Sequence, residues 1–282
     1  MATAVERQST GQKIGKAVLL AMIVAWCLLP FAWLVTTSLK QGDAALNNPN
    51  PFHGPFGLGN YRSVFGAGFL YNLRNSAVVA GTTTLICVAI GALAAYALVR
   101  LPLKGKVVIL GAVLAVSLYP PIALVPPLYE VWRKIGLLNT YPGLCIPYTA
   151  FTLPITIFVL TTFFAAIPPD MEEAARVDGA TPLQAFWRVV VPLAAPGIFA
   201  AAILVFVYSW NEFLLASVFT PRDLAAQTVT VAIANFPGAV EFQVPIGSVT
   251  AASVATTIPM ILVALVFQRR IVSGLTAGGV KG

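Results

Sequence analysis

The sequence predicts an all-α, polytopic membrane protein with six transmembrane helices and a two-helix loop between the fourth and fifth of them. Of the 282 residues, 58% are hydrophobic and only 10% are charged, whereas soluble proteins carry about 25% charged residues. The mean hydropathy is +0.85. The apolar residues also gather in runs too long for the core of a soluble domain, and one of the loops between these runs carries helix start and stop signals of its own.

Six apolar runs are long enough to cross a membrane as helices. Crossing a hydrocarbon layer of roughly 30 Å takes about 20 mostly apolar residues. The six runs cover residues 14–37, 74–99, 107–129, 142–166, 194–219 and 246–268. Barrel strands would alternate apolar and polar residues, but these runs are apolar on all sides. Helices are then the spanning structure that pairs every backbone group inside lipid.

The N-terminal run is predicted to be retained as the first span. Lys13 and Lys16 precede it, as in a secretion signal, but it continues past Trp33 to Leu39 without a small-residue cleavage site. We therefore expect three parts: a cytoplasmic N-terminal segment at 1–13, a six-helix transmembrane domain at 14–268 that includes the loop at 167–193, and a cytoplasmic tail at 269–282.

The basic residues predict the orientation and the location. With the N-terminus in the cytoplasm, 11 of the 17 Lys and Arg residues fall inside and six outside. This bias favours both termini, and the loop at 167–193, in the cytoplasm of a cell whose inner membrane holds the chain. The net charge of +7 flanks membrane spans and forms no single patch, so nucleic acid is not an expected partner. One histidine and three scattered cysteines predict no metal site.

The loop at 167–193 carries the signals of two short helices. Asp170 and Glu173 have the spacing of a capping box, which predicts a helix start. Gly179 can adopt the left-handed conformation that ends a helix. A second start follows, with a capping residue, a proline at the first helical position and a glutamine at the third: Thr181, Pro182 and Gln184. Placed between two spans, such a hairpin can act as a lever.

This loop resembles the EAA loop of binding-protein-dependent ABC importer permeases. The pattern consists of Glu173-Ala174-Ala175, then Gly179, and then Val189, Val191 and Pro192. The family often has Ile and Leu where Val189 and Val191 stand. In that family the loop docks into a cleft of a cytoplasmic ATPase subunit. The resemblance therefore implies ATPase-coupling roles for Glu172, Glu173, Ala174, Ala175, Asp178, Gly179 and Pro192.

The resemblance covers nearly the whole chain. Within the family, the chain is most similar to the sugar-importing branch. This similarity rests on Asn75-Ser76, Ala95-Tyr96-Ala97, Gly136-Leu137-Leu138-Asn139-Thr140 and Trp210-Asn211-Glu212-Phe213. The chain as a whole resembles trehalose- or maltose-type importers of the mycobacterial sort. Its C-terminal tail is similar to that of the maltose importer's second permease subunit, where the tail reaches between the two ATPases. This implies roles near the ATPases for Gly274, Thr276, Gly278 and Lys281.

The implied function is movement of a sugar, such as trehalose or maltose, across the membrane by alternating access. The implied protein partners are a second, non-identical permease, two copies of an ATPase and an extracytoplasmic solute-binding protein or lipoprotein. Membrane lipid surrounds the spans as a further partner. The chain is not expected to be an enzyme, because its nearest match to a phosphate-binding loop, Gly11 to Ala17, has the wrong spacing and lacks the final hydroxyl. ATP and Mg²⁺ are thus expected on the ATPase subunits, with no cofactor on this chain.

Polar residues within the predicted spans are candidates for a sugar path or gate. Glu212 is the only carboxylate in any predicted span, and a charge there is too costly to face lipid. Asn211 and Trp210 stand beside it. Thr149, Thr152 and Thr156 share one helix face, and Pro121 lies in a proline-rich break of the third span. Structural alternatives are a Glu212 that holds helices together, threonines that bond carbonyls freed by prolines, and prolines that only end the span.

Other functions remain as alternatives. An ABC permease for another solute, such as glycerol phosphate, fits the same signals. An ion-coupled secondary transporter would favour inverted repeats and several ionisable residues near the membrane midplane. A membrane enzyme would need a nucleophile with a base, or a metal cluster. A secondary transporter leaves the 167–193 loop unexplained, and Glu212 is the only ionisable candidate within a span. One histidine in a loop and the lack of a carboxylate pair in the predicted spans argue against an enzyme.

Overall fold

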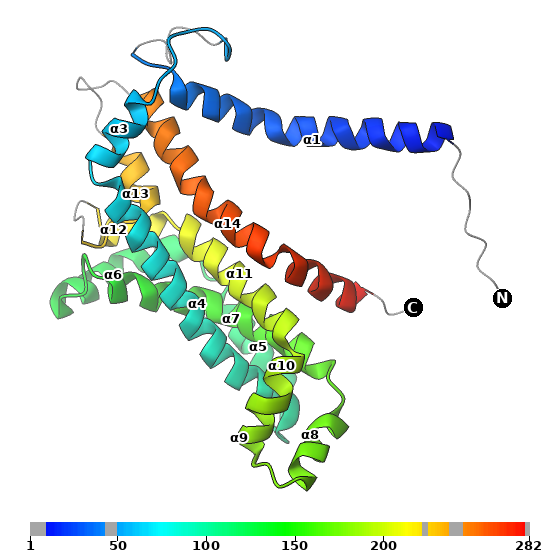
Figure 1. Cartoon of the computed structure of the whole chain (residues 1–282). Coiled ribbons are helices and arrows are strands. Elements are labelled where there is room, and N and C mark those ends of the chain that lie inside the picture. Colours follow the sequence, from blue (N-terminus) through cyan, green and yellow to red (C-terminus); the bar gives the residue numbers. More distant parts are fainter. Residues whose placement is uncertain (1–9, 43–49, 222–224, 237–244, 280–282) are drawn as a thin grey trace. The chain divides into compact units, whose positions relative to one another are not determined.

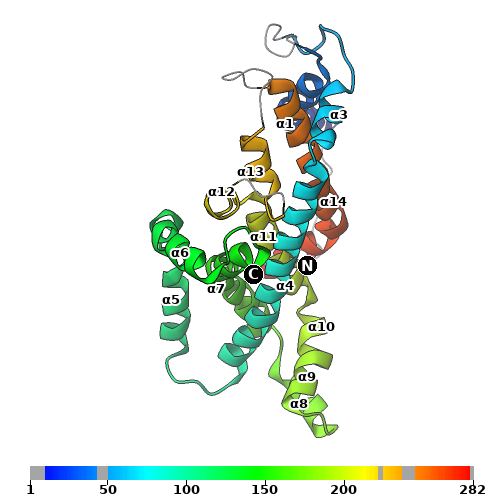
Figure 2. The same cartoon turned by 90° about the vertical axis from the view of Figure 1, so that its left-hand side faces the viewer.

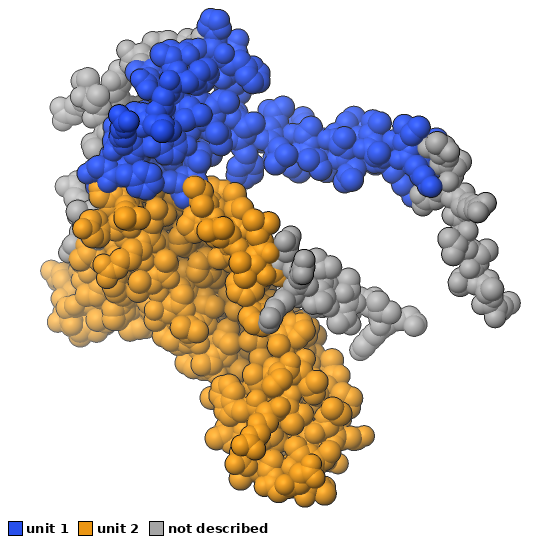
Figure 3. Space-filling model, in the orientation of Figure 1, with its two compact units in different colours: residues 1–67, 236–255 blue, residues 68–235, 256–282 orange. Residues whose placement is uncertain are grey.

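The computed structural model describes residues 10–42, 50–221, 225–236 and 245–279, without the side chains beyond Phe267. The chain divides into two compact units (Figure 3). One unit holds residues 1–67 and 236–255, and the other holds residues 68–235 and 256–282. The described residues form helices joined by turns, with one isolated antiparallel bridge between Lys40 and Phe56.

The first unit is built from α1 (Thr10–Leu39), α3 (Gly59–Gly66) and the start of α14 (Ile246–Gly279). Asn60 of α3 joins the end of α1, because its Nδ2 donates to the carbonyls of Ser38 at 2.9 Å and Lys40 at 2.7 Å. The Lys40 side chain is buried, and its Nζ donates to the Asn50 carbonyl at 2.7 Å. These bonds hold the chain that leaves α1 against α3.

The core of the second unit is a bundle of α4 (Phe69–Arg100), α7 (Tyr141–Ala165) and α11 (Ala195–Asn211) (Figures 1 and 2). Small residues let α4 and α7 approach closely. A Cβ on Gly91 of α4 would lie 2.7 Å from Cγ2 of Thr156 on α7. Any larger residue at position 91 would therefore require the Thr156 side chain or the two helices to move.

The third predicted span is broken. Helices α5 (Lys106–Val116) and α6 (Pro121–Ile135) meet at a 77° bend, which Figure 2 shows clearly. Pro120 and Pro121 stand at the start of α6, with Pro121 in the first turn, where its missing N–H costs nothing. The predicted break of the third span is confirmed at Pro120 and Pro121. Pro126 and Pro127, further along the same proline-rich stretch, lie inside α6 and do not break it.

The fifth predicted span also differs from a straight helix. The chain runs through α8 (Pro169–Val177), α9 (Pro182–Ala185), the π-helical turn η1 (Phe186–Val190) and α10 (Val191–Leu193), and then turns by 78° into α11. Pro196 in the first turn of α11 has no N–H, which favours the turn. Helix α11 ends at Asn211, and α12 (Leu214–Phe219) and α13 (Val229–Ala234) follow. The predicted helix over 194–219 is therefore two helices with a break at 212–213.

In the described part of the chain, four helices are long and apolar enough to cross a membrane alone. They are Gly11–Leu39, Phe69–Arg100, Tyr141–Ala165 and Ile246–Phe267. The number rises to six if each bent pair forms one span. The all-α membrane fold is therefore confirmed, with two of the six spans built from bent helices. Helix α14 runs on to Gly279, so the predicted boundary at 269 lies inside a helix.

Candidate functional site

The loop between α7 and α11 contains the two predicted short helices, α8 and α9, at the foot of the second unit in Figure 1. Gly179 has φ +87° and ends α8. Its N–H donates to the Arg176 carbonyl at 3.1 Å, and the Ala180 N–H donates to the Ala175 carbonyl at 3.0 Å. This is the Schellman arrangement, which satisfies carbonyls at the end of a helix. The predicted stop at Gly179 is confirmed.

The predicted start of the second helix is also confirmed, whereas that of the first is wrong. The Gln184 N–H donates to Thr181 Oγ1 at 3.3 Å, and the Thr181 N–H donates to Gln184 Oε1 at 2.9 Å, which completes a capping box. Helix α8, however, begins after Pro168, which has no capping side chain. Asp170 lies inside the first turn, where its charge still suits the positive end of the helix dipole.

Most of the residues that the family pattern marks in this loop face outward. Glu173, Ala174, Asp178, Gly179 and Pro192 are exposed, and Ala175 is half-buried. Apolar side chains accompany them on the outer surface of the loop: Met171, Val177, Leu183 and Trp187. Exposed apolar groups beside charged ones are typical of a protein-docking surface.

Glu172 is the exception, because its side chain points inward and is buried. Its carboxylate accepts hydrogen bonds from the Tyr96 hydroxyl and, at 3.1 Å, from Arg100 Nε. Both donors belong to the last turns of α4. Arg100 Nη2 also donates to the Ile167 carbonyl at 2.9 Å. The sequence predicted Glu172 in the loop's functional set but gave no sign of these partners, which lie more than 70 residues away.

An aromatic cluster joins the same end of α4 to η1. The Tyr96 ring lies 4.9 Å from that of Phe186, measured between centroids. Phe186 is itself buried between Phe164 of α7 at 6.3 Å and Trp187 at 5.0 Å. Tilted and edge-to-face ring pairs at these distances are favourable. The two-helix loop is thus held to α4 and α7 by polar and apolar contacts together.

At the other candidate site, Glu212 lies at the break between α11 and α12, and not inside one continuous helix over 194–219 as predicted. Its carboxylate accepts from the backbone N–H of Leu215 at 2.8 Å and of Ala216 at 3.1 Å, and from the Tyr148 hydroxyl at 2.5 Å. Thr230 Oγ1 donates to its backbone carbonyl at 2.8 Å. The side chain therefore satisfies first-turn donors of α12 and ties this helix to α7.

The neighbours of Glu212 differ in what they can contact. Asn211 is exposed, and its Nδ2 donates to the Val207 carbonyl at 2.8 Å. Trp210 is buried and stacks on Phe206 at a centroid distance of 5.6 Å. Its Nε1 has no hydrogen-bond partner among the described residues. Asn211 is exposed, Glu212 is half-buried, and a sugar ring would have to displace packing to reach Trp210.

The three threonines of α7 do not form one exposed strip. Thr152 and Thr156 are buried and donate to carbonyls of their own helix, Tyr148 at 2.7 Å and Thr152 at 2.8 Å. These carbonyls are not those that Pro147 and Pro154 leave without a partner. The one freed by Pro147, on Gly143, accepts from Trp132 Nε1 at 2.7 Å. The expected bonding of threonines to the freed carbonyls is therefore not what the structure has.

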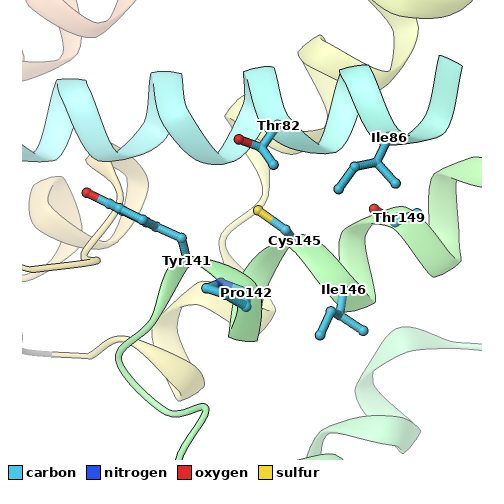
Figure 4. A pocket seen from close by; sticks show the side chains of 7 residues that line it. All are labelled: Thr82, Ile86, Tyr141, Pro142, Cys145, Ile146 and Thr149. Carbon is cyan, nitrogen blue, oxygen red and sulfur yellow. The ribbon is translucent and has the colours of Figure 1, made fainter. Parts of the chain in front are cut away.

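Thr149 lines a pocket of about 320 Å³ between α4 and α7 (Figure 4). Figure 4 shows Thr82 and Ile86 of α4 pointing toward α7, and Cys145 and Thr149 of α7 pointing back toward them. The lining is mostly apolar. The pocket therefore lacks the polar groups that a sugar needs.

A polar cluster joins α4 to the segment before α13. The sequence marked two of its members, Asn75 and Ser76, only as part of the family resemblance and did not predict the cluster. Asn72 Nδ2 donates to the Gln227 carbonyl and to its Oε1, both at 3.1 Å, and Asn75 Nδ2 donates to the same carbonyl at 3.0 Å. The Val229 N–H donates to Ser76 Oγ at 2.9 Å. The spacing of Asn72, Asn75 and Ser76 on one helix face was the available signal. The cluster fixes the segment after α12 near Glu212.

The remaining predicted residues lie elsewhere. Pro121 opens α6, as described above. Gly274, Thr276 and Gly278 lie in α14, where only the backbone is described. Lys281 lies outside the described residues. Among the described residues there is no group of three or more His, Cys, Asp or Glu that could hold a metal ion.

Comparison with known proteins decides the family. Residues 87–276 match the sequence model of the binding-protein-dependent transport system inner membrane component. The chain belongs to this family. As an inner membrane component of a binding-protein-dependent system, it serves transport that relies on a separate binding protein.

Curated relatives of this inner membrane component are similar over nearly their full length. The trehalose transport system permease protein SugB of Mycobacterium tuberculosis is 48% identical, with 94% of this chain and 97% of that protein covered. The trehalose/maltose transport system permease protein MalG of Thermococcus litoralis is 42% identical, with 94% and 95% covered. The sulfoquinovosyl glycerol transport system permease protein SmoH of Agrobacterium fabrum is 43% identical, with 90% and 89% covered.

A solved structure shares the fold of this inner membrane component. It is a bacterial ABC transporter involved in the import of the acidic polysaccharide alginate. The match has a TM-score of 0.76 and 24% identity, and it covers 96% of this chain and 100% of the other. The bent helices and the α8–α9 loop thus belong to a known permease fold.

Proposed function

We propose that the chain is a permease subunit of an ATP-driven ABC importer, and that it moves a sugar by alternating access. The observation that carries this proposal is the similarity, at 42% to 48% identity over more than nine-tenths of the chain, to permeases named for trehalose and for trehalose/maltose. We propose a disaccharide of this kind as substrate. The 43% identity to a sulfoquinovosyl glycerol permease makes a glycoside of glycerol the second candidate.

The proposed ATPase-docking surface is the outer face of the α8–α9 loop. Glu173, Asp178 and the exposed apolar side chains Met171, Val177 and Leu183 support this role. Two cytoplasmic ATPase subunits would bind ATP and Mg²⁺ and drive the cycle, and the tail around Gly274, Thr276, Gly278 and Lys281 would approach them. A second, non-identical permease and an extracytoplasmic solute-binding protein complete the proposed assembly. Both termini and the loop lie in the cytoplasm in this proposal.

The proposed sugar contact on this chain is Asn211. Its amide is exposed at the end of α11, and amide groups hydrogen-bond sugar hydroxyls. Glu212 holds the chain next to Asn211 in place, because its carboxylate accepts hydrogen bonds from the Tyr148 hydroxyl and from the Leu215 N–H of α12. We assign Thr152 and Thr156 to packing between α4 and α7, in view of their burial and intrahelical bonds.

The test is ATPase stimulation in the purified, reconstituted complex of this chain with its second permease, ATPase and binding protein. A panel of trehalose, maltose, sulfoquinovosyl glycerol and glycerol phosphate is added with saturating binding protein. We expect stimulation by a disaccharide and none by glycerol phosphate. Stimulation by glycerol phosphate alone, or ATPase activity in the purified permease without the ATPase subunit, would overturn the proposal.

A further inference from the structure

Glu172 is oriented differently from the other charged residues of α8. Asp170, Glu173 and Arg176 are exposed, whereas Glu172 is 8% exposed. Its side chain faces α4 and not the surface that we propose for the ATPase. A buried carboxylate needs partners, and the end of α4 supplies two: the Tyr96 hydroxyl and Arg100 Nε at 3.1 Å.

Tyr96 and Arg100 lie four residues apart on one face of α4, and together they contact α8 and η1. Arg100 bonds the Glu172 carboxylate and also the Ile167 carbonyl at 2.9 Å, just before α8. Tyr96 bonds the same carboxylate, and its ring packs on Phe186 of η1 at 4.9 Å. The last turn of α4 is thus fastened to the entrance of α8, to α8 itself and to η1.

The Glu172–Arg100 pair is largely shielded from water, with 11% of the Glu172 side chain and 14% of the Arg100 side chain exposed. Removing one member of such a pair leaves the other buried without a partner, which costs far more than breaking an exposed pair. Rotation of α8 against α4 would break this pair together with the bond to Tyr96. The loop and the end of α4 are therefore expected to move as one body.

We propose that Glu172 is a positioning residue that joins the α8–α9 loop to α4 through Arg100 and Tyr96, so that a push on the loop moves α4. It does not contact the ATPase. This inference rests on the proposed function, since it states how motion received at the docking surface reaches the bundle of α4, α7 and α11. Glu173, the next residue, is on the outer face and belongs to the docking surface itself.

The test compares Glu172→Ala, Arg100→Ala and the double variant in the reconstituted complex. Glu130→Ala is the matched control, because it breaks the exposed Glu130–Arg133 pair at 2.7 Å on α6. For both single variants we expect normal co-purification with the ATPase, and sugar transported per ATP lowered by about tenfold or more. The double variant is expected to be no worse than Arg100→Ala, because the two residues act as one unit. Glu130→Ala is expected to behave as wild type.

Two further variants separate coupling from folding. Glu172→Arg with Arg100→Glu restores an ion pair in reverse, and we expect it to recover part of the transport per ATP that either single variant loses. Glu173→Ala is expected to reduce ATPase co-purification instead. Loss of ATPase binding in Glu172→Ala equal to that in Glu173→Ala would make Glu172 a docking residue and overturn the inference. So would normal sugar transport per ATP in Glu172→Ala.

A measurement that needs no sugar distinguishes failure of this inference from failure of the proposed function. Hydrogen exchange of the backbone amides of α8 is measured in the intact complex, for the wild type and for Glu172→Ala. Faster exchange over Pro169–Val177 in the variant supports the joint even if no sugar stimulates the wild-type complex. Unchanged exchange there would contradict the joint, whatever the complex transports.

Discussion

At the scale of single residues, Glu212 shows how a carboxylate in an apolar run can be structural. Its oxygens accept two backbone N–H groups of α12 and the Tyr148 hydroxyl. The helix break exposes donors that would otherwise be unpaired in a dry region, and the carboxylate supplies their partner. The cost of placing an acid there is offset by these three bonds.

The first prediction follows from these bonds. Glu212→Ala removes the cap of α12 and leaves the Tyr148 hydroxyl without its partner, which should lower stability by about 2 kcal/mol or more. We expect a lower Tm of the purified complex for Glu212→Ala and a smaller drop for Glu212→Gln, which keeps an acceptor. Asn211→Ala is the matched control: it should keep the Tm and lose uptake. An unchanged Tm in Glu212→Ala would show that the cap contributes nothing.

Gly179 is a second residue whose role follows from local structure, here from its backbone conformation. Its φ of +87° suits glycine, and nothing lies within 4 Å of where a Cβ would stand. A side chain would therefore act on the backbone alone and would not clash with neighbours.

The second prediction is that Gly179→Val strains the turn by about 1 kcal/mol or more and shifts α9 relative to α8. Sugar-stimulated ATPase activity should fall while the chain still inserts. Gly179→Asn is the control, since asparagine tolerates the left-handed conformation far better than a β-branched residue. Equal, normal stimulation in both variants would remove the turn from the coupling mechanism.

At the scale of elements, the sequence predicts helices well and their breaks poorly. Hydropathy locates α4, α7 and the start of α14 to within a few residues, because lipid demands a minimum length of apolar helix. It misses the end of α14, which continues past the apolar run to Gly279. Local capping chemistry predicts the turn at Gly179 and the start at Thr181. The break at 212–213 contains neither proline nor glycine, so no local signal marks it.

The candidate sites, too, are only partly predictable from the sequence. The outward residues of the α8–α9 loop follow from the family pattern. The partners of Glu172 and Glu212 do not, because Tyr96, Arg100 and Tyr148 are 64 to 76 residues distant in sequence and meet them only through packing of α4 and α7. Helical periodicity places Thr149, Thr152 and Thr156 on one face but does not show what covers it. Thr152 and Thr156 are buried between these two helices.

At the scale of the whole molecule, the third prediction concerns orientation. In a variant with Cys27→Ser, Cys87→Ala and Cys145→Ala, we introduce Phe52→Cys or Val177→Cys, at positions where 84% and 87% of the residue is exposed. An impermeant thiol reagent should label position 52 in intact cells, and position 177 only after the membrane is opened, as the bias in basic residues predicts. Labelling of position 177 but not 52 in intact cells would reverse the topology.

The function of the whole assembly is tested most directly by sugar accumulation. Proteoliposomes holding this chain, its second permease and the ATPase, with ATP and Mg²⁺ on the ATPase side, receive labelled trehalose and the binding protein on the opposite side. We predict accumulation above the outside concentration that depends on ATP and on the binding protein and is insensitive to a proton ionophore. Uptake that proceeds without ATP, or that the ionophore abolishes, would contradict import of sugar by an ATP-driven permease.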